Sequence, residues 1–395
     1  MKIPACPLTE AADVIRGVTF SKGDALSEPR NGFIPLLRAG NIQDHLILNS
    51  DLVFVPERMV SEKQRLRSGD IVMCTSSGSA EIVGKTAFSY SDWTGSFGAF
   101  CAVVRPKRGK CDPRYLFHYL QSSGFRDWTR NSSGVGIKNI RKSELDTVEI
   151  PLPDLGEQHR IATILDKADV IRRKQKQSLA LADDFLKSVF LEIFGNPATN
   201  PMGHRMASFE SILTIPLRNG ISPSGRGDVI ARVLTLTAIT GDRFDGSQAK
   251  EGKFLAPISA KDAVNESDFY ICRGNGSPDL IGKGFFADRN IENTAFPDTM
   301  IAAKPDLSAV TRAYLESIWN SSFVRNQIQE AARTTNGTFK INQTAAGSIK
   351  IPLPPFALQE RFQTIVSNVR RTMERLRVDD GLCPSLSQRA FRGEL

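Results

Sequence analysis

The sequence predicts a mixed α/β fold, of the α+β kind, that occurs twice in the chain. Two similar globular modules are joined and separated by two long helices that pair as a coiled coil. The first observation is a repeated phrase, since IPLPDLGEQHRIATIL at 150–165 returns as IPLPPFALQERFQTIV at 351–366. The other two are SGDIVMCTSSGSAEIVGK at 68–85, which returns as ESDFYICRGNGSPDLIGK at 266–283, and RPKRGKCDPRYLFHYLQSSGFR at 105–126, which returns as KPDLSAVTRAYLESIWNSSFVR at 304–325. The offsets drift only from 198 to 201, so one unit occurs twice and gives the chain a pseudo-two-fold internal repeat.

Length and composition agree with two globular modules. A chain of 395 residues exceeds one ordinary hydrophobic core, and 41% hydrophobic with 24% charged residues is typical of folded proteins. The 51 Lys and Arg against 43 Asp and Glu give a net charge of +8, which is compatible with a polyanion such as nucleic acid. The N-terminus has no long apolar core, and no apolar run approaches the roughly 18 residues of a membrane helix. We therefore expect a cytoplasmic protein without a membrane partner.

The six cysteines form no CxxC pair, and their spacing matches no zinc ribbon. We expect reduced, partly buried thiols and no metal site.

The globular part of each module should combine strands with a following helix. Apolar, β-rich runs such as DIVMC at 70–74 and GAFCAVVRP at 98–106 are separated by Gly and Ser, which indicates strands and turns. The stretch PRYLFHYLQSSGFRDW at 113–128 carries apolar residues at helical spacing and predicts a helix after the strands.

The IPLP segments should be extended, because each Pro keeps the residue before it out of the α region. A helix follows at once in the first copy, where Asp154 is a good N-cap and Glu157 lies at the spacing of a capping box. The second copy has Pro355 and Leu358 at these two positions, so its helix relies on Pro in the first turn.

The first helix should be long and unbroken. Residues 157–194 contain no Pro or Gly, and apolar residues recur at steps of three and four until GNPATNP at 195–201 ends the helix. About 40 residues at 1.5 Å each make a rod of about 60 Å. The second helix meets DDGLCP at 379–384 and should be shorter or kinked. Each apolar stripe needs a partner, and its own duplicate is the nearest one; the alternative is that each helix packs only on its own module.

The order of these features resembles the specificity subunit of type I restriction–modification systems. Two divergent globular modules are each followed by IPLP, a Gln near the helix start (Gln158, Gln359) and a long helix. The ends FLKSVFLEIFGNP and SLSQRAFRGEL are also similar to helix ends of that family. The resemblance covers essentially the whole chain. It divides the chain into target recognition domain 1 at 1–150, a central helical spacer at 151–197, target recognition domain 2 at 198–350 and a C-terminal helical spacer at 351–395.

The resemblance implies a DNA-reading role within a larger complex. Each recognition domain would read one half of a split site in double-stranded DNA. The two helices would form an antiparallel coiled coil that holds the two readers apart. The helices would also recruit two methyltransferase subunits, which carry S-adenosylmethionine, and a motor-nuclease restriction subunit would join them. A rod of about 60 Å limits the separation of the half-sites to roughly 18 base pairs.

The sequence carries no recognisable catalytic motif. It lacks a Pro-Pro-aromatic loop of adenine methyltransferases, a nuclease-type acidic cluster, a P-loop and HExxH, so we expect no enzyme activity and no cofactor on this chain. Two alternatives stay open: a stand-alone bipartite DNA-binding regulator, and an endonuclease with an unrecognised motif.

Candidate DNA contacts are polar residues in Gly-rich loops with nearby Lys or Arg, since base edges need polar side chains and phosphates need cations. The loops TSSGSAE at 75–81 and RGNGSPD at 273–279 follow the same strand in both copies, and RNSSGVGIKN at 130–139 matches RTTNGTFKIN at 333–342. LLRAGNI at 36–42 and VLTLTAI at 233–239 differ in their polar positions. The candidates are Arg38, Asn41, Ser77, Ser79, Lys85, Arg130, Lys138, Asn139, Thr235, Asn275, Ser277, Lys283, Arg333 and Lys340. Ordinary turns and solvated loop charges use the same residue types, and this alternative stays open.

Overall fold

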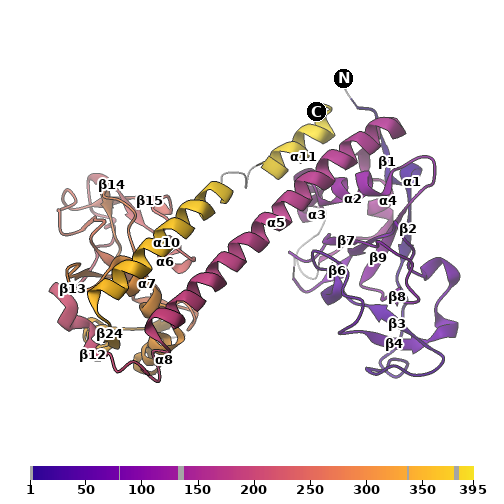
Figure 1. Ribbon diagram of the computed structural model, residues 1–395. Coiled ribbons are helices and arrows are strands. Elements are labelled where there is room, and N and C mark those ends of the chain that lie inside the picture. Colours follow the sequence, from indigo (N-terminus) through magenta and orange to yellow (C-terminus); the bar gives the residue numbers. More distant parts are fainter. Residues whose placement is uncertain (1–2, 80, 132–137, 336–337, 378–381) are drawn as a thin grey trace. The chain divides into compact units, whose positions relative to one another are not determined.

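The computed structural model describes residues 3–79, 81–131, 138–335, 338–377 and 382–395. Packing divides the chain into two units (Figure 1). The first unit consists of Met1–Gln177 and Leu376–Leu395, and the second unit consists of Ser178–Arg375. This division follows packing. The four predicted segments follow chain order instead, and their boundaries stay a prediction (1–150, 151–197, 198–350 and 351–395).

The main sheet of each unit has four antiparallel strands in the same order. In the first unit the order is β2 (Ala12–Arg16), β9 (Cys101–Pro106), β5 (Ile71–Cys74) and β7 (Thr86–Phe88). In the second unit the order is β13 (Leu213–Asn219), β21 (Met300–Pro305), β17 (Phe269–Cys272) and β19 (Gly284–Phe286). Each strand therefore has a counterpart in the other unit.

A second sheet repeats in the same way, with a central strand that pairs once antiparallel and once parallel. The first unit has β4 (Val53–Pro56), β3 (Phe33–Leu37) and β8 (Ser96–Phe97). The second unit has β15 (Ala249–Phe254), β14 (Val229–Leu234) and β20 (Ile291–Ala295), to which β16 (Ala263–Val264) adds a fourth strand. The two sheets together confirm the α+β fold, and their matching order supports the internal repeat.

The stretch after β9 forms two helices instead of the single helix that its spacing predicts. They are α2 (Pro113–Gln121) and α3 (Ser123–Asn131). Ser122 between them has extended backbone, and its hydroxyl accepts the Phe125 N–H at 3.3 Å. A side chain that offers the backbone such a partner favours a helix end. The second unit has α7 (Arg312–Trp319) and α8 (Ser322–Ala331).

Shorter elements complete each unit. In the first unit they are α1 (Leu8–Ala11), α4 (Lys142–Asp146) and the 3₁₀ turns η1 (Ala39–Asn41), η2 (Glu57–Met59) and η3 (Glu62–Gln64). In the second unit they are the turn η4 (Phe209–Ile212), α6 (Thr237–Thr240) and α9 (Gln343–Ser348).

Both IPLP segments are strands, as their prolines predict. The first forms β11 (Glu149–Pro151), which pairs antiparallel with β1 (Ala5–Pro7), and the second forms β24 (Lys350–Leu353), which pairs with β12 (Arg205–Ser208). Ile150 and Ile351 are fully buried in their cores. The hydroxyls of Tyr115 and Tyr314 donate to the carbonyls of Pro151 and Pro352, so both segments are held at the same point.

A buried glutamine joins each IPLP segment to the helix after it. Gln158 is 1% exposed; its Oε1 accepts the Asp112 N–H at 2.8 Å, and its Nε2 donates to the Pro153 carbonyl at 2.7 Å. Gln359 is fully buried and makes the same two contacts, with the Thr311 N–H at 3.0 Å and the Pro354 carbonyl at 2.9 Å. In both units the glutamine therefore ties the long helix to the N-cap of the helix that follows the main sheet.

The helix after the first IPLP segment is α5 (Leu155–Phe194), with 40 residues. Asp154 accepts the Glu157 N–H at 3.0 Å, which confirms Asp154 as the N-cap. The Glu157 carboxylate accepts two hydrogen bonds from Arg160. The helix ends at Gly195, whose φ of +74° suits glycine after a helix C-terminus.

The structure describes the second helix in two parts. They are α10 (Phe356–Arg377), with 22 residues, and α11 (Leu382–Arg392), with 11 residues. α11 has about three turns and begins inside DDGLCP, at Leu382. Residues 378–381, which hold the first half of DDGLCP, lie outside the described residues.

Helix pairing is antiparallel within each unit (Figure 1). In the second unit, Phe190 and Phe194 near the end of α5 contact Phe362 near the start of α10, with ring centroids 5.7 and 5.4 Å apart. In the first unit, Ala390 of α11 lies in one buried cluster with Ile161 and Leu165 near the start of α5. Each part of α5 thus packs on its module and also on a helix from the end of the chain.

Candidate nucleic-acid interface

The structure joins the two predicted DNA-contacting loops of each unit through a short β-pair. In the first unit, β6 (Ser76–Ser77) pairs with β10 (Lys138–Asn139), with Ser77 opposite Lys138. In the second unit, β18 (Gly274–Asn275) pairs with β23 (Thr338–Lys340), and β22 (Arg333–Thr335) pairs on its other side. Residues about 60 positions apart in the sequence therefore meet at one place in each unit.

The β-pair is positioned by the buried strand before it. The Cys74 and Cys272 thiols donate to the carbonyls of Ser76 and Gly274, at 3.4 and 3.7 Å. Burial raises the pKa of both thiols, that of Cys272 to about 11, so they stay protonated donors at neutral pH. This agrees with the expected reduced, buried cysteines; the described ones are Cys6, Cys74, Cys101, Cys111 and Cys272.

Glycine closes the loop after β6 and after β18. Gly84 and Gly282 have φ of +80° and +70°, and their N–H groups donate to the carbonyls of Cys74 and Cys272 at 2.8 Å. Positive φ is a conformation that glycine adopts at little cost. The repeated GK at 84–85 and 282–283 is therefore explained by backbone geometry.

A hollow lies beside each β-pair. In the first unit its volume is about 230 Å³, and its polar lining includes Arg16, Asn139, Arg141 and Lys142. In the second unit its volume is about 370 Å³, and its polar lining includes Arg273, Lys340, Asn342 and Thr344. Both linings carry basic groups and amides, which suit phosphates and base edges. Of these residues, only Asn139 and Lys340 were predicted from the sequence.

Several predicted residues hold the loops in shape. The Ser77 hydroxyl accepts the Ser79 N–H at 3.2 Å, and the Asn275 amide oxygen accepts the Ser277 N–H at 3.0 Å. Ser79 is exposed, whereas the other three are half-buried. The Ser77 hydroxyl and the Asn275 NH₂ can each still donate a hydrogen bond.

Lys85 and Lys283 hold equivalent loops of the second sheet. Lys85 Nζ donates to the Gln43 side-chain oxygen at 2.7 Å, and Lys283 Nζ donates to the Thr240 and Gly241 carbonyls at 3.0 and 3.1 Å. Gln43 and Gly241 are themselves related by the repeat offset of 198. The two lysines thus have a shared structural role beside any contact with DNA.

The loops after β3 and β14 hold the other predicted residues. Asn41 is 1% exposed; it accepts the Arg38 N–H at 2.8 Å and donates to the carbonyls of Ile47 and Ser50. Both hydrogens of its amide are used within the loop, which gives Asn41 a structural role there. Arg38 pairs with Asp51 at the surface, and the Thr235 hydroxyl bonds the Thr237 hydroxyl at 2.6 Å.

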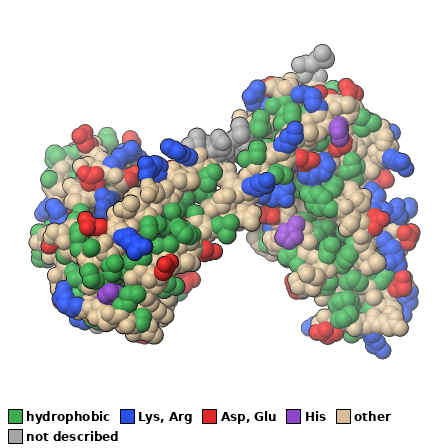
Figure 2. All heavy atoms as spheres, viewed as in Figure 1, with side chains coloured by type: hydrophobic (Ala, Val, Ile, Leu, Met, Phe, Trp, Pro, Cys, Tyr) green, Lys and Arg blue, Asp and Glu red, His purple; other side chains and the backbone are tan. Residues whose placement is uncertain are grey.

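Arg130 is exposed on α3 and pairs with Asp127 at 3.3 Å. Lys340 and Asn139 are exposed, whereas the side chains of Lys138 and Arg333 lie outside the described residues. Figure 2 shows Lys and Arg on the visible face of each unit, interspersed with acidic and apolar side chains. The basic bias of the chain is therefore distributed, and local geometry has to identify the functional cations.

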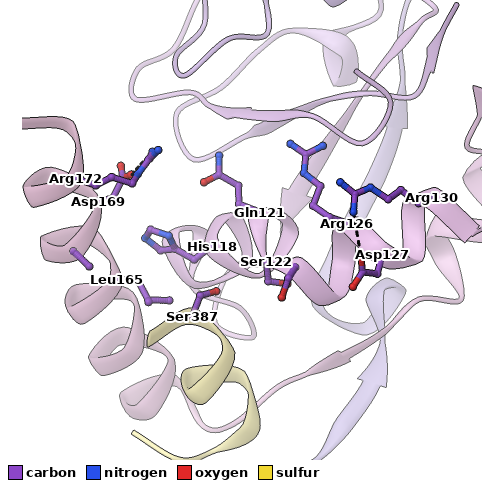
Figure 3. A pocket seen from close by; sticks show the side chains of 12 residues that line it. His118, Gln121, Ser122, Arg126, Asp127, Arg130, Leu165, Asp169, Arg172 and Ser387 are labelled. Atoms are coloured by element: carbon purple, nitrogen blue, oxygen red, sulfur yellow. Dashed lines mark hydrogen bonds and ion pairs between the residues drawn. The ribbon is translucent and has the colours of Figure 1, made fainter. Parts of the chain in front are cut away.

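Arg126 was not among the residues predicted from the sequence. It lines a hollow between α2, α3, α5 and α11 of the first unit (Figure 3). The signal that could have found it is its counterpart Arg325 in the second copy.

In the part of the chain that the structure describes, no three His, Cys, Asp or Glu side chains gather as a metal site. None of the described helices has the length and apolar content that crossing a membrane requires.

Comparison with known proteins agrees with this architecture. Residues 6–181 match a family model described as the type I restriction modification DNA specificity domain. The type I restriction enzyme EcoKI specificity subunit of Escherichia coli (strain K12) is 31% identical over 98% of this chain and 88% of its own length. The StySPI specificity subunit of Salmonella potsdam is 29% identical over the same shares.

Solved structures share the fold. The type I restriction–modification system S subunit from M. genitalium superposes with a TM-score of 0.60 at 14% identity, over 99% of this chain and 96% of that chain. A chain from a study of type I R-M system assembly superposes with a TM-score of 0.51 at 17% identity, over the full length of both chains. The 31% identity to the EcoKI subunit extends over nearly the whole chain, and the fold agrees with it. This chain therefore belongs to the specificity subunits of type I restriction–modification systems, which recognise the DNA sequence.

Proposed function

We propose that each unit reads one half of a bipartite site in double-stranded DNA, and that the chain has no catalytic activity of its own. The observation that carries the proposal is the β-pair with its hollow, present in both units with different side chains. Ser76 and Ser77 in the first unit stand where Gly274 and Asn275 stand in the second. A shared backbone with different polar groups is what two readers of different base sequences need.

Affinity in this proposal comes from the cations around each β-pair. Arg16, Arg141 and Lys142 line the hollow of the first unit, and Arg273 and Lys340 line that of the second. Cations that neutralise backbone phosphates supply binding energy that does not depend on sequence. The polar loop residues Ser77, Ser79, Asn275 and Ser277 then supply the preference for particular bases.

The helices are proposed to set the spacing between half-sites and to dock two methyltransferase subunits, which carry S-adenosylmethionine; a motor-nuclease subunit completes the complex. Large apolar side chains on α5 support docking. Leu181 and Phe185, four residues apart on one helical face, are 62% and 51% exposed. Neighbouring exposed apolar side chains of this size often mark a protein interface.

The test exchanges residues 1–150 for those of a relative with a different target and reads the methylation motif of the host genome. One half of the motif should change, while the other half and the spacer length stay the same. The reciprocal exchange of residues 198–350 is the matched control and should change the other half. A motif that changes in both halves after either exchange would refute the two-reader proposal.

Two further measurements address the complex and the absence of catalysis. Expressed with its genomic neighbours, the chain should retain a methyltransferase through purification; a chain that never does is a stand-alone regulator. The purified chain with DNA and Mg²⁺ should leave the DNA intact, and any cleavage would make it an endonuclease.

A further inference from the structure

A basic hollow of about 480 Å³ lies in the first unit, away from the β-pair in sequence (Figure 3). Its walls are α2, α3, the first part of α5 and α11. A smaller hollow of about 90 Å³ shares Gln121, Arg126 and Arg172 with it and continues to Lys85. The two hollows thus form one continuous basic region, defined by these four residues, Arg130 and Arg173.

Positive charge exceeds negative charge in the basic region. Five Arg or Lys line the two hollows, against three Asp. Each Asp already has a basic partner. The pairs are Asp127 with Arg130 at 3.3 Å, Asp169 with Arg172 at 2.8 Å and with Arg173 at 3.1 Å, and Asp44 with Lys176 at 3.8 Å. Lys85 donates to the neutral Gln43, so its charge and that of Arg126 are not balanced by these carboxylates.

Arg126 has no partner among the described residues. No hydrogen bond or ion pair joins its guanidinium to that part of the chain, although the side chain is half-buried. Burial, followed by the nearby charge of Arg130, lowers the pKa of Arg126. A partly desolvated guanidinium without an anion is unfavourable, so its surroundings favour an anionic ligand.

The equivalent arginine of the second unit is satisfied by its own chain. Arg325, at the repeat offset of 199, donates to the carbonyls of Pro278 and Asp279 at 3.0 Å and to that of Ile281. These carbonyls belong to the loop that follows β18. The loop can therefore bind the guanidinium of an arginine at this position, and the described residues of the first unit do not.

We infer that Arg126, assisted by Lys85, binds a phosphate of the DNA backbone beside the half-site read by the first unit, and that the second unit lacks this contact. The inference rests on the proposed function and adds a positioning contact to it. A guanidinium matches the oxygens of a phosphate in a bidentate fork. Lys85 directly follows Gly84, which closes the loop of the candidate interface, so the basic region begins where that loop ends.

The experiment uses the full chain with its methyltransferase subunits, bound to a duplex that carries the methylated motif of the host. Affinity is measured over a range of salt concentrations for the wild type and for Arg126→Gln. Loss of one phosphate contact should weaken binding several-fold and reduce the slope of log K against log salt by about 0.9. Lys187→Gln, an exposed lysine of α5 paired with Asp184, is the matched loss of one charge and should leave the slope unchanged.

Phosphate ethylation interference locates the contact. The wild type should show a phosphate beside the first half-site whose ethylation blocks binding, and Arg126→Gln should lose this one signal while keeping those of the second half-site. Arg126→Lys keeps the charge and should recover part of the affinity. All variants should unfold at the wild-type temperature, because the Arg126 guanidinium bonds to no described residue and the substitutions leave the backbone bonds of α3 in place.

The outcomes separate the two proposals. A wild type that does not bind the duplex would refute the proposed function itself. A wild type that binds, with Arg126→Gln equal to it in slope and interference pattern, would refute only the phosphate contact. Loss of the methyltransferase from purified Arg126→Gln would make the basic region a protein-docking surface and would also overturn the inference.

Discussion

The two units are alike where they build the scaffold and different where a ligand would meet them. Gln158 and Gln359 make the same pair of contacts, and the main sheets have the same strand order. Arg126 and Arg325 occupy equivalent positions, yet of the two guanidinium groups only that of Arg325 is bonded to described residues. The two copies have thus kept the contacts that join the sheet to the long helix. The side chains that differ lie in loops and among the groups that face these loops.

A buried carboxylate shows that even the scaffold can change its partner. Asp70 and Asp268, related by the offset of 198, are both 1% exposed. Asp70 receives two bonds from Arg105 on β9, whereas Asp268 is paired with Arg218 on β13. The position of the negative charge is retained, but the positive charge comes from a different strand.

The largest expected effect comes from removing these arginines. Arg105→Ala leaves the Asp70 carboxylate buried and unpaired, which should cost the first unit about 3–5 kcal/mol of unfolding free energy. Arg218→Ala should cost the second unit less, because burial already raises the pKa of Asp268 and makes its neutral form easier to reach. Amide hydrogen exchange of β5 and β17 measures each unit separately.

The same measurement contains its own control. Arg105→Ala should leave exchange in β17 at the wild-type rate, and Arg218→Ala should leave β5 unchanged. A variant that loosens both strands equally would show that the two units unfold together, and the comparison between them would lose its basis.

An intermediate effect is expected from the buried glutamines. Gln158→Ala removes the acceptor of the Asp112 N–H, and Gln359→Ala removes that of the Thr311 N–H. A buried donor without a partner costs about 1–3 kcal/mol, so each variant should destabilise its own unit by a similar amount. Thermal unfolding of both single variants checks this, and losses that differ by more than about 2 kcal/mol would contradict equal roles.

The smallest expected effect is a dependence of stability on pH that the first unit has and the second lacks. His118 is buried, and its Nε2 lies 2.7 Å from the Asp166 carboxylate. Asp166 also forms an ion pair with Arg114, and the negative charge of Asp169 is close to His118. Burial lowers the pKa of His118 below its ordinary 6.5, although the bond to Asp166 opposes this. As the pH falls, the unfolded chain therefore binds a proton at His118 before the folded chain does. The contribution of neutral His118 to the free energy of unfolding is fully present above pH 6.5. It is lost as the pH falls through the lower pKa of the folded state. Ser317 stands at the equivalent position of the second unit.

Hydrogen exchange at pH 7.5 and 5.5, corrected for intrinsic rates, should show α2 of the first unit loosening more than α7 of the second. His118→Gln should abolish the excess. An excess that persists in this variant would mean that another group of the first unit titrates.

Much of the architecture could be predicted from the sequence, since the repeat fixes which segments must fold alike. The IPLP strands and the Asp154 N-cap follow from local rules on Pro and Asp. The role of Gln158 could not be predicted, because it bonds Asp112, 46 residues away. Periodicity describes which face of an element is buried but not which side chain meets it.

The candidate site divides in the same way. The two polar loops were predicted separately, and their junction through β6 and β10 required the fold. Asn41 looked like a base reader because its residue type is polar, whereas its three bonds within the loop are invisible in sequence. Arg126 was overlooked because an arginine in a helical pattern is usually a solvated charge.

The return of α11 to the first unit affects the order in which the protein can be built. Phe391 of α11 packs on Tyr115 and Tyr119, with ring centroids 5.5 and 5.3 Å apart. The residue that covers these aromatic partners is made about 270 residues after them. At roughly 5–20 residues per second, the first module waits roughly 14–55 s with this surface open. A chaperone that covers α2 during synthesis would therefore protect the nascent chain, and the final helix would release it.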